Sequence, residues 1–157
     1  MKFLKRLFSK KEHLIECPRC LGKGCVDDND IKRLGQELRW KTGRCAYCTG
    51  TGKVASDMIN KVAVDEAYLT TNLTSIERKR FIHGHPDAIE RSEIAEMQIQ
   101  QAITEIRQLH FIKKLDAEQI AELYLISEVG FGDKRYNIEK AKMIAYINKV
   151  IAAEDKE

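Results

Sequence analysis

Two short stretches of the chain carry the same pattern of cysteine and glycine. CPRCLGKG at residues 17–24 and CAYCTGTG at residues 45–52 both follow the spacing C-x-x-C-x-G-x-G. Each CxxC turn presents two sulfurs on one side, so two such turns can surround one ion if the chain folds back on itself. Four thiolates form the closed tetrahedral shell of a structural Zn²⁺ site, with no vacancy for water or substrate. We therefore expect one Zn²⁺, bound by Cys17, Cys20, Cys45 and Cys48.

Four glycines follow these cysteines in matching positions, Gly22 with Gly50 and Gly24 with Gly52. The backbone must turn sharply after each CxxC if its N–H groups are to point at the sulfurs, and glycine adopts the positive φ that such a turn needs. The two CxxC pairs are separated by 24 residues, which is longer than the usual ribbon spacing. The insert, which contains Trp40, the only tryptophan, must therefore loop out.

The repeat resembles the cysteine-rich zinc-binding domain of DnaJ chaperones, which is built from CxxCxGxG repeats. That family usually has four repeats and two zinc sites, with the first repeat pairing with the fourth and the second with the third. The resemblance covers residues 17–53 and implies that the outer zinc site is kept, while the insert around Trp40 replaces the inner pair. It also implies an extended β-hairpin-like knuckle, binding of non-native polypeptide and communication with a DnaK-type partner.

A second motif of the same family, HPD, stands at His85, Pro86 and Asp87. J domains use this tripeptide to stimulate a DnaK-type ATPase, but there it ends a long helix and the J domain precedes the zinc domain. In this chain the order is reversed and the preceding helix is short. Proline in the first turn of a helix with an aspartate beside it is ordinary helix-start chemistry. We favour that structural interpretation, with partner binding by the three residues as the alternative.

Composition and charge narrow the class of protein. The 157 residues, 43% of them hydrophobic and 32% charged, fit one domain or a small module attached to a modest one. Residues 1–53 carry 13 Lys and Arg against 6 Asp and Glu, whereas residues 54–157 carry 14 against 18. Such a basic first third is compatible with docking to nucleic acid or to an anionic membrane surface.

The positions of the cysteines bear on the cellular compartment. All five cysteines lie within residues 17–48, and no stretch has the pattern of a secretory signal or of a membrane span. These features predict a reducing, cytoplasmic location. The fifth cysteine, Cys25, is interpreted as a small apolar residue beside Val26.

Helical periodicity replaces the cysteine pattern after Ser56. One further short helix is expected in the insert, with Asp30 as its N-cap. The predicted fold is mainly α: a small zinc-knuckle or β-hairpin module at residues 14–54, followed by an α-helical bundle domain at residues 55–157. Residues 1–13 are expected to form a basic amphipathic segment that packs on the protein or touches a membrane surface through residues 3–8. The expected helices run from Asp57 to about Tyr68, from Thr74 toward His83, from Pro86 to about Leu115, from Asp116 toward Gly130, and onward from Asn137 as N-cap.

No other feature of the chain resembles catalytic machinery. We therefore expect a non-enzymatic zinc-binding protein that acts as an interaction or adaptor protein in the manner of a chaperone or co-chaperone. Its partner is then a protein or an unfolded polypeptide, with a DnaK-type chaperone among the candidates. One alternative is a nucleic-acid-binding zinc-ribbon protein that acts through the basic N-terminal third. Another, a thiol–disulfide enzyme, would need a free reactive CxxC pair.

Overall fold

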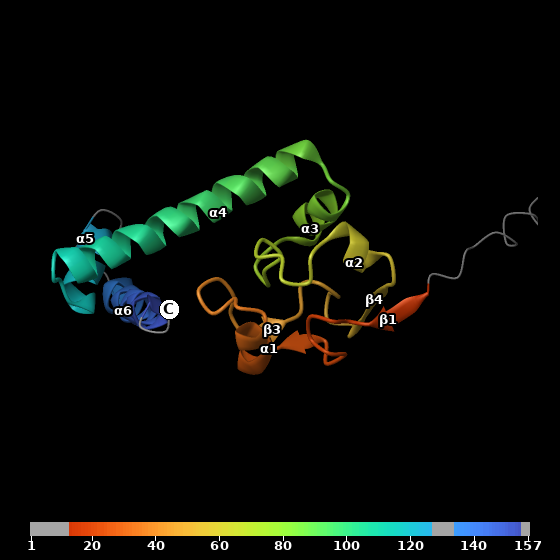
Figure 1. The fold of residues 1–157 in the computed structure, drawn as a ribbon, viewed down its shortest axis with the longest axis horizontal. Coiled ribbons are helices and arrows are strands. Elements are labelled where there is room, and N and C mark those ends of the chain that lie inside the picture. The colour runs from red at the N-terminus through yellow and green to blue at the C-terminus, as the bar shows by residue number, and fades with distance from the viewer. Residues whose placement is uncertain (1–12, 127–133, 155–157) are drawn as a thin grey trace, which may run out of the picture. The chain divides into compact units, whose positions relative to one another are not determined.

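The computed structural model describes residues 13–126 and 134–154. The basic segment at residues 1–12 and the expected helix stop at Gly130 lie outside the described residues. The described part is mainly helical with four short strands (Figure 1). In chain order the elements are β1 (Leu14–Glu16), β2 (Cys25–Val26), α1 (Asp28–Arg33), β3 (Gly43–Arg44), β4 (Lys53–Ala55), α2 (Met58–Lys61), α3 (Ser75–Ile82), α4 (Pro86–Arg107), the π-helix η2 (Gln108–Ile112), α5 (Ala117–Ile126) and α6 (Lys134–Glu154).

The chain divides into two compact units, Met1–Ile89 and Glu90–Glu157, and the boundary falls within α4. The sequence placed a boundary between residues 54 and 55, where the cysteine repeat ends. In the structure, residues beyond that point pack with the cysteine module: the Tyr47 hydroxyl donates to the carbonyl oxygen of Val62 (2.8 Å), and Arg78 donates to that of Ala46 (2.5 Å). The first unit therefore contains both the cysteine repeat and the segment that covers it.

Four short strands carry the cysteine turns in two antiparallel pairs. β1 pairs with β4, with Ile15 opposite Val54, and β2 pairs with β3, with Cys25 opposite Arg44. The strand before the first turn thus lies beside the strand after the second turn, and the two inner strands lie beside each other (Figure 1). This nested pairing brings together the two CxxC turns, whose matching cysteines are 28 residues apart in the sequence.

The insert between the two cysteine turns contains α1, and its N-cap is Asp27 rather than Asp30. The Asp27 carboxylate accepts from the backbone N–H of Asp30 (3.0 Å), and the Asp30 carboxylate accepts from that of Asp27 (3.2 Å). The two aspartates form a reciprocal capping box, in which either one alone has the right residue type for the N-cap. Asp30 is buried and is neutralised by Lys23 (2.6 Å) and Arg33 (3.3 Å).

The helix expected from Asp57 to about Tyr68 is wrong in length, because α2 ends at Lys61. Val62 has an extended backbone (φ −141°), and turns follow as far as residue 73. The carbonyls of Val64, Glu66 and Leu69 in these turns accept hydrogen bonds from Arg19. A helix that continued to Tyr68 would have used the Val64 carbonyl internally, whereas carbonyls in its last turn have no internal partner. A hydrogen bond from Arg19 therefore takes the place of a helical one at Val64, since tertiary contacts often override helix propensity.

The starts predicted for α3 and α4, at Thr74 and Pro86, are confirmed. The Thr74 hydroxyl accepts from the backbone N–H of Glu77 (3.2 Å) and caps α3. Gly84 follows the end of α3 with φ +69°, and α4 begins at Pro86. α4 runs to Arg107 and passes into η2, so the helical stretch expected as far as about Leu115 ends in a π-helix at Ile112.

In the second unit, α5 packs against α6. The start of α5 is confirmed, because Asp116 and Gln119 exchange side-chain and backbone hydrogen bonds of 2.9 and 3.0 Å. The start predicted for α6 is wrong: the helix begins at Lys134, so Asn137 lies within its first turn and is not its N-cap.

Among the described helices, none combines the length and the apolar character needed to cross a membrane. The buried side chains of the second unit are those of Ile103, Ile106, Ile120, Ala121, Leu125, Ile147 and Val150.

Candidate metal centre

The four cysteines of the two CxxC pairs converge in the core of the first unit. Their sulfur atoms all lie within 4.8 Å of one another, and their side chains are at most 3% exposed. Cys17 and Cys45 approach to 3.9 Å between sulfurs, and Cys20 and Cys48 to 3.8 Å. Sulfurs about 2.3 Å from a central tetrahedral ion lie about 3.8 Å apart, so the donor set fits one metal ion. The cluster can hold a metal ion, and it is sealed from solvent.

The backbone around the cluster repeats its hydrogen bonds from one turn to the other. Gly24 donates its N–H to the sulfur of Cys20 (3.2 Å), and Gly52 donates in the same way to Cys48 (3.3 Å). The backbone N–H of Cys17 donates to the carbonyl oxygen of Gly52 (2.8 Å), and the backbone N–H of Cys45 donates to that of Gly24 (3.0 Å). Donors aimed at sulfur favour the thiolate, which is the form that binds metal. The two stretches therefore form a site with approximate twofold symmetry.

Two of the matched glycines are required by close approach of the two turns. A Cβ on Gly24 would lie 2.5 Å from the carbonyl oxygen of Gly50, and a Cβ on Gly52 would collide with that of Gly22. Both positions also have positive φ, +76° at Gly24 and +72° at Gly52. Any other residue here would separate the turns that carry the cysteines, so these glycines set the spacing of the site.

Without a metal, the thiols of Cys20 and Cys45 have raised pKa values and hold their protons more tightly than free thiols do. Burial raises the pKa of the Cys20 thiol to about 11. The pKa of Cys45 is also raised, first by its hydrogen bond with Cys17 and then by burial. A cation that enters must displace these protons, and its positive charge replaces the solvation that burial removes.

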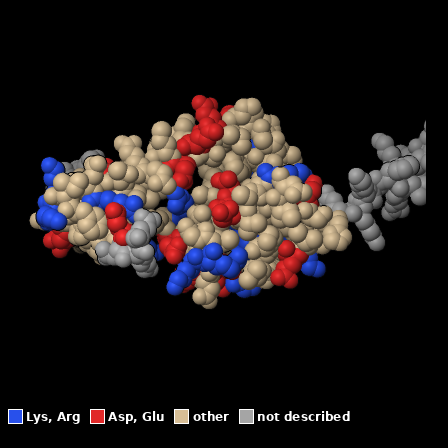
Figure 2. Space-filling model, in the orientation of Figure 1, with Lys and Arg blue, Asp and Glu red and all other residues tan. Residues whose placement is uncertain are grey.

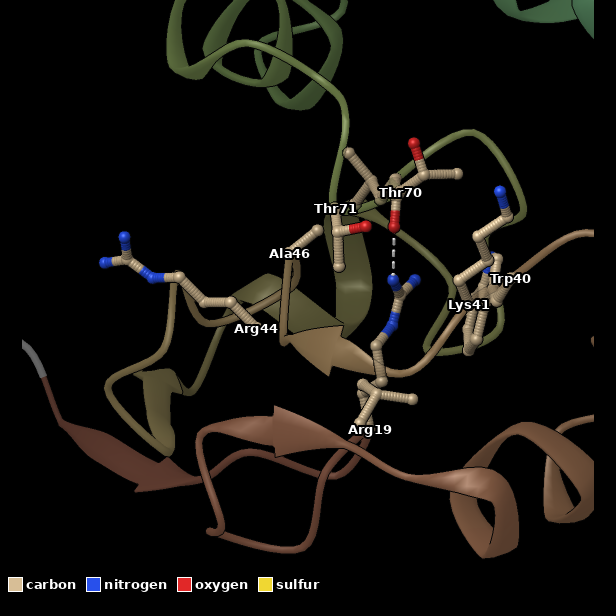
Figure 3. Close-up of a pocket in the computed structure, with 9 residues that line it drawn as sticks. Arg19, Trp40, Lys41, Arg44, Ala46, Thr70 and Thr71 are labelled. Carbon is tan, nitrogen blue, oxygen red and sulfur yellow. Dashed lines mark hydrogen bonds between the residues drawn. The ribbon is translucent and has the colours of Figure 1, made fainter. Parts of the chain in front are cut away.

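Arg19, inside the first CxxC turn, joins the cluster to the segment after α2. Its guanidinium donates to the carbonyl oxygens of Val64 (2.8 Å), Leu69 (2.6 Å) and Glu66 (3.0 Å). Figure 3 shows the Arg19 side chain extended toward this segment, with one of these hydrogen bonds dashed beside Thr70. The guanidinium carbon also lies 4.1 Å from the ring centroid of Trp40. Arg19 is only 1% exposed, so its charge is satisfied almost entirely by protein groups.

Two arginines balance the charge of a loaded site. Burial lowers the pKa of Arg19 to about 10, and its interactions with Cys45 and Cys17 oppose that change, so it stays cationic at neutral pH. Arg78 of α3, bound to the carbonyls of Ala46 and Tyr47 (both 2.5 Å), is likewise buried in part and interacts with the same cysteines. Four thiolates around a dication have a formal charge of −2, which two guanidinium groups offset.

The remaining candidate residues lie outside the cluster. Cys25 is exposed while its neighbour Val26 is buried, so Cys25 does not pack as a core residue. His85 is exposed, and its carbonyl accepts from the N–H groups of Ala88 and Ile89 at the start of α4. Asp87 forms an ion pair with Arg80 of α3. The HPD residues thus occupy the junction between α3 and α4.

Sequence reasoning missed the residues that hold the cysteine turns in place. Nothing in the sequence marked Arg19 or Tyr47, the variable residues inside the CxxC pairs, as buried. The type of residue at position 19 did indicate a role in charge balance, though not burial, since a cation beside four thiolates is electrostatically favourable. Its acceptor carbonyls, 45 to 50 residues later, carry no side-chain signature.

Comparison of the chain with models of protein families, with curated proteins and with solved structures gave no match.

Proposed function

We propose that the four cysteines hold one structural Zn²⁺ and that the chain is a non-enzymatic interaction or adaptor protein of chaperone-like character. The observation that carries this proposal is the convergence of four buried sulfurs within 4.8 Å, from two turns of identical pattern. A complete set of thiolates favours zinc in a structural role, because it leaves no coordination position for a reacting group.

The surroundings of the cluster support a structural role for the ion. The turns are tied to residues 62–69 through Arg19 and Tyr47, and to α3 through Arg78. The folding energy of the metal site is therefore transmitted to the segment that covers the cysteine module. A metal-fixed module of this kind presents a defined surface to a partner, which fits an adaptor better than it fits a catalyst.

The resemblance of the two CxxCxGxG repeats to the DnaJ zinc domain supports a polypeptide partner. The HPD tripeptide at residues 85–87 adds a DnaK-type chaperone as the partner to test first. A basic surface for nucleic acid has less support, because Asp27 and Asp30 pair with Lys23 and Arg33 within the basic first third. Figure 2 shows acidic side chains beside basic ones on the face drawn.

Elemental analysis of the purified full-length chain tests the metal, and client aggregation tests the role. We expect one zinc per chain, which Cys17→Ser and Cys45→Ser each remove, while Cys25→Ser leaves the metal content unchanged. We further expect the wild-type chain to suppress aggregation of a denatured client, and Cys17→Ser to abolish that suppression. A chain that carries no transition metal after isolation without chelators would refute the zinc site, and a zinc-loaded chain with no effect on clients would refute the chaperone-like role.

A further inference from the structure

A groove beside the second cysteine turn lies outside the metal centre. It has a volume of about 400 Å³ and is enclosed by the second turn, by β4 and by the helices α2 and α3 of the first unit. A volume of this size lies within the range of ligand-binding pockets. It is large enough for one or two side chains of a bound peptide.

The floor of the groove is apolar. Val54 and Met58 contribute from the core, at 6% and 7% exposure, and Ile82 is half-buried. Leu14 stands at the edge and is 56% exposed, which is unusual for a leucine that borders a concave surface. Because Val54 and Met58 are nearly buried, most of the exposed apolar area that a ligand could cover comes from Leu14 and Ile82.

The rim of the groove is basic, and two of its cations are not engaged. Lys61 pairs with Asp57 (2.7 Å), and Arg78 is bound to carbonyls of the second cysteine turn. Lys53 and Lys79 also line the groove, are exposed, and have no carboxylate partner within residues 13–126 and 134–154. Free cations around an apolar floor favour a ligand that has carboxylates on either side of an apolar side chain.

The groove favours a peptide over nucleic acid. Proteins bind single-stranded nucleic acid through aromatic side chains on which the bases stack. No Phe or Trp is among the described residues that line the groove. Tyr47 is fully buried with its hydroxyl bonded to the Val62 carbonyl, and the exposed imidazole of His83 is hydrogen-bonded to the Lys79 carbonyl. The chain's own N-terminal segment is disfavoured as occupant, because residues 1–12 carry five Lys and Arg against one Glu.

The backbone of β4 bears on how such a peptide would be held. β4 pairs with β1 along one edge. At Lys53, the other edge is blocked, because the Thr51 hydroxyl donates to the Lys53 carbonyl (2.8 Å) and accepts from the Lys53 N–H (3.3 Å). Addition of a partner strand to this edge is therefore hindered. Side chains, rather than backbone pairing, supply the contacts.

We propose that this groove binds an acidic peptide segment of a partner protein, with an apolar side chain on the floor and flanking carboxylates at Lys53 and Lys79. The inference deepens the proposed function, on which it rests, by giving the chemistry of the partner. It requires a segment of opposite charge, in contrast to general affinity for exposed apolar polypeptide.

The test uses the full, metal-loaded chain and short fluorescein-labelled peptides in which one central leucine is flanked by Asp and Glu. Fluorescence anisotropy is expected to show saturable binding that weakens between about 50 and about 200 mM salt. Replacing the leucine by serine, or the acids by their amides, should weaken binding by roughly tenfold, as should the double variant K53Q/K79Q. Leu14→Thr should weaken binding without altering the salt dependence.

The matched control is K32Q/K41Q, which removes the same charge from exposed lysines of the first unit that do not line the groove. Full affinity in this control supports the groove; equal losses in both double variants would overturn it, since attraction would then be general. Absence of saturable peptide binding would overturn it, and so would preferred binding of a labelled oligothymidylate through the same lysines. Zinc content, measured on every sample, separates the outcomes: failure with one zinc per chain refutes the groove alone, and failure without zinc refutes the metal site.

Discussion

The backbone N–H of Cys17 donates to the carbonyl oxygen of Gly52 across 2.8 Å. The first ligand of one turn is thus positioned by the last glycine of the other, 35 residues later in the sequence. The reciprocal bond from Cys45 to Gly24 has almost the same length, 3.0 Å. The two turns therefore hold each other in place, and neither can form the site alone.

Gly52→Ala should prevent the cluster from closing. The new Cβ would collide with the carbonyl of Gly22, and positive φ adds about 1–2 kcal/mol of strain for any residue with a Cβ. We expect loss of bound metal and a lower free energy of unfolding, measured by elemental analysis and chemical denaturation. Gly35→Ala is the control, because Gly35 has φ +65° but open space around its Cβ position. This variant should be destabilised only by the backbone strain and should keep the metal. Equal effects of the two substitutions would contradict the role of close approach.

Arg19→Met should destabilise the first unit by about 3 kcal/mol or more, because three carbonyls lose their donor. Arg19→Lys keeps the charge but cannot reach all three carbonyls with one ammonium group, so we expect an intermediate loss. Chemical denaturation of metal-loaded protein measures both. If Arg19→Lys were as stable as wild type, charge balance alone would explain this residue.

Metal removal should be visible in the fluorescence of Trp40, the only tryptophan. Its ring contacts Arg19, and its indole N–H donates to the carbonyl of Ala67 (3.2 Å). Loss of the metal releases the first cysteine turn, so we expect a chelator to shift the emission to longer wavelength and added zinc to restore it. An unchanged spectrum after verified metal removal would mean that residues 62–69, which cover the cysteine module, fold independently of the metal site.

Metal affinity should rise with pH. The raised pKa values of Cys20 and Cys45 keep both thiols protonated at neutral pH, so an incoming dication displaces at least these two protons. Calorimetric titration in two buffers of different ionisation enthalpy measures that number. The stability of the metal-free fold depends on pH in the opposite sense. The raised pKa of Cys20 contributes stability below the ordinary thiol pKa of 9.0, and this contribution is lost as the pH rises toward 11. Proton release near zero would contradict the buried, protonated state of the empty site.

Substitutions of the histidine and of the aspartate in the HPD motif should differ in their effects on stability. Asp87→Asn removes the ion pair with Arg80 and should cost up to about 1 kcal/mol, whereas His85→Gln alters an exposed side chain and should leave the unfolding midpoint unchanged. Neither should change the metal content. If the chain stimulated a DnaK-type ATPase and His85→Gln abolished that stimulation, the helix-start interpretation of this motif would be incomplete.

The sequence by itself determined the local features whose cause lies within a few residues. The metal ligands could be proposed from Cys17 to Cys48 because CxxC geometry is fixed by one turn, and the starts of α3, α4 and α5 followed from Thr74, Pro86 and Asp116 because capping is a local hydrogen bond. Similar reasoning was wrong for α1, where Asp27 and Asp30 compete for the same cap, and for α6, which begins at Lys134 and not after Asn137.

Only the tertiary structure decided what surrounds the cluster. Residues 62–68 leave the helix predicted for them, and the carbonyls of Val64 and Glu66 in this segment accept hydrogen bonds from Arg19, which lies more than 40 residues earlier. The apolar floor with Lys53 and Lys79 is likewise assembled from β4, α2 and α3, none of which carries a recognisable motif. A local sequence pattern indicates which groups one turn can position. Burial and long-range hydrogen bonds depend instead on which distant segment packs against that turn.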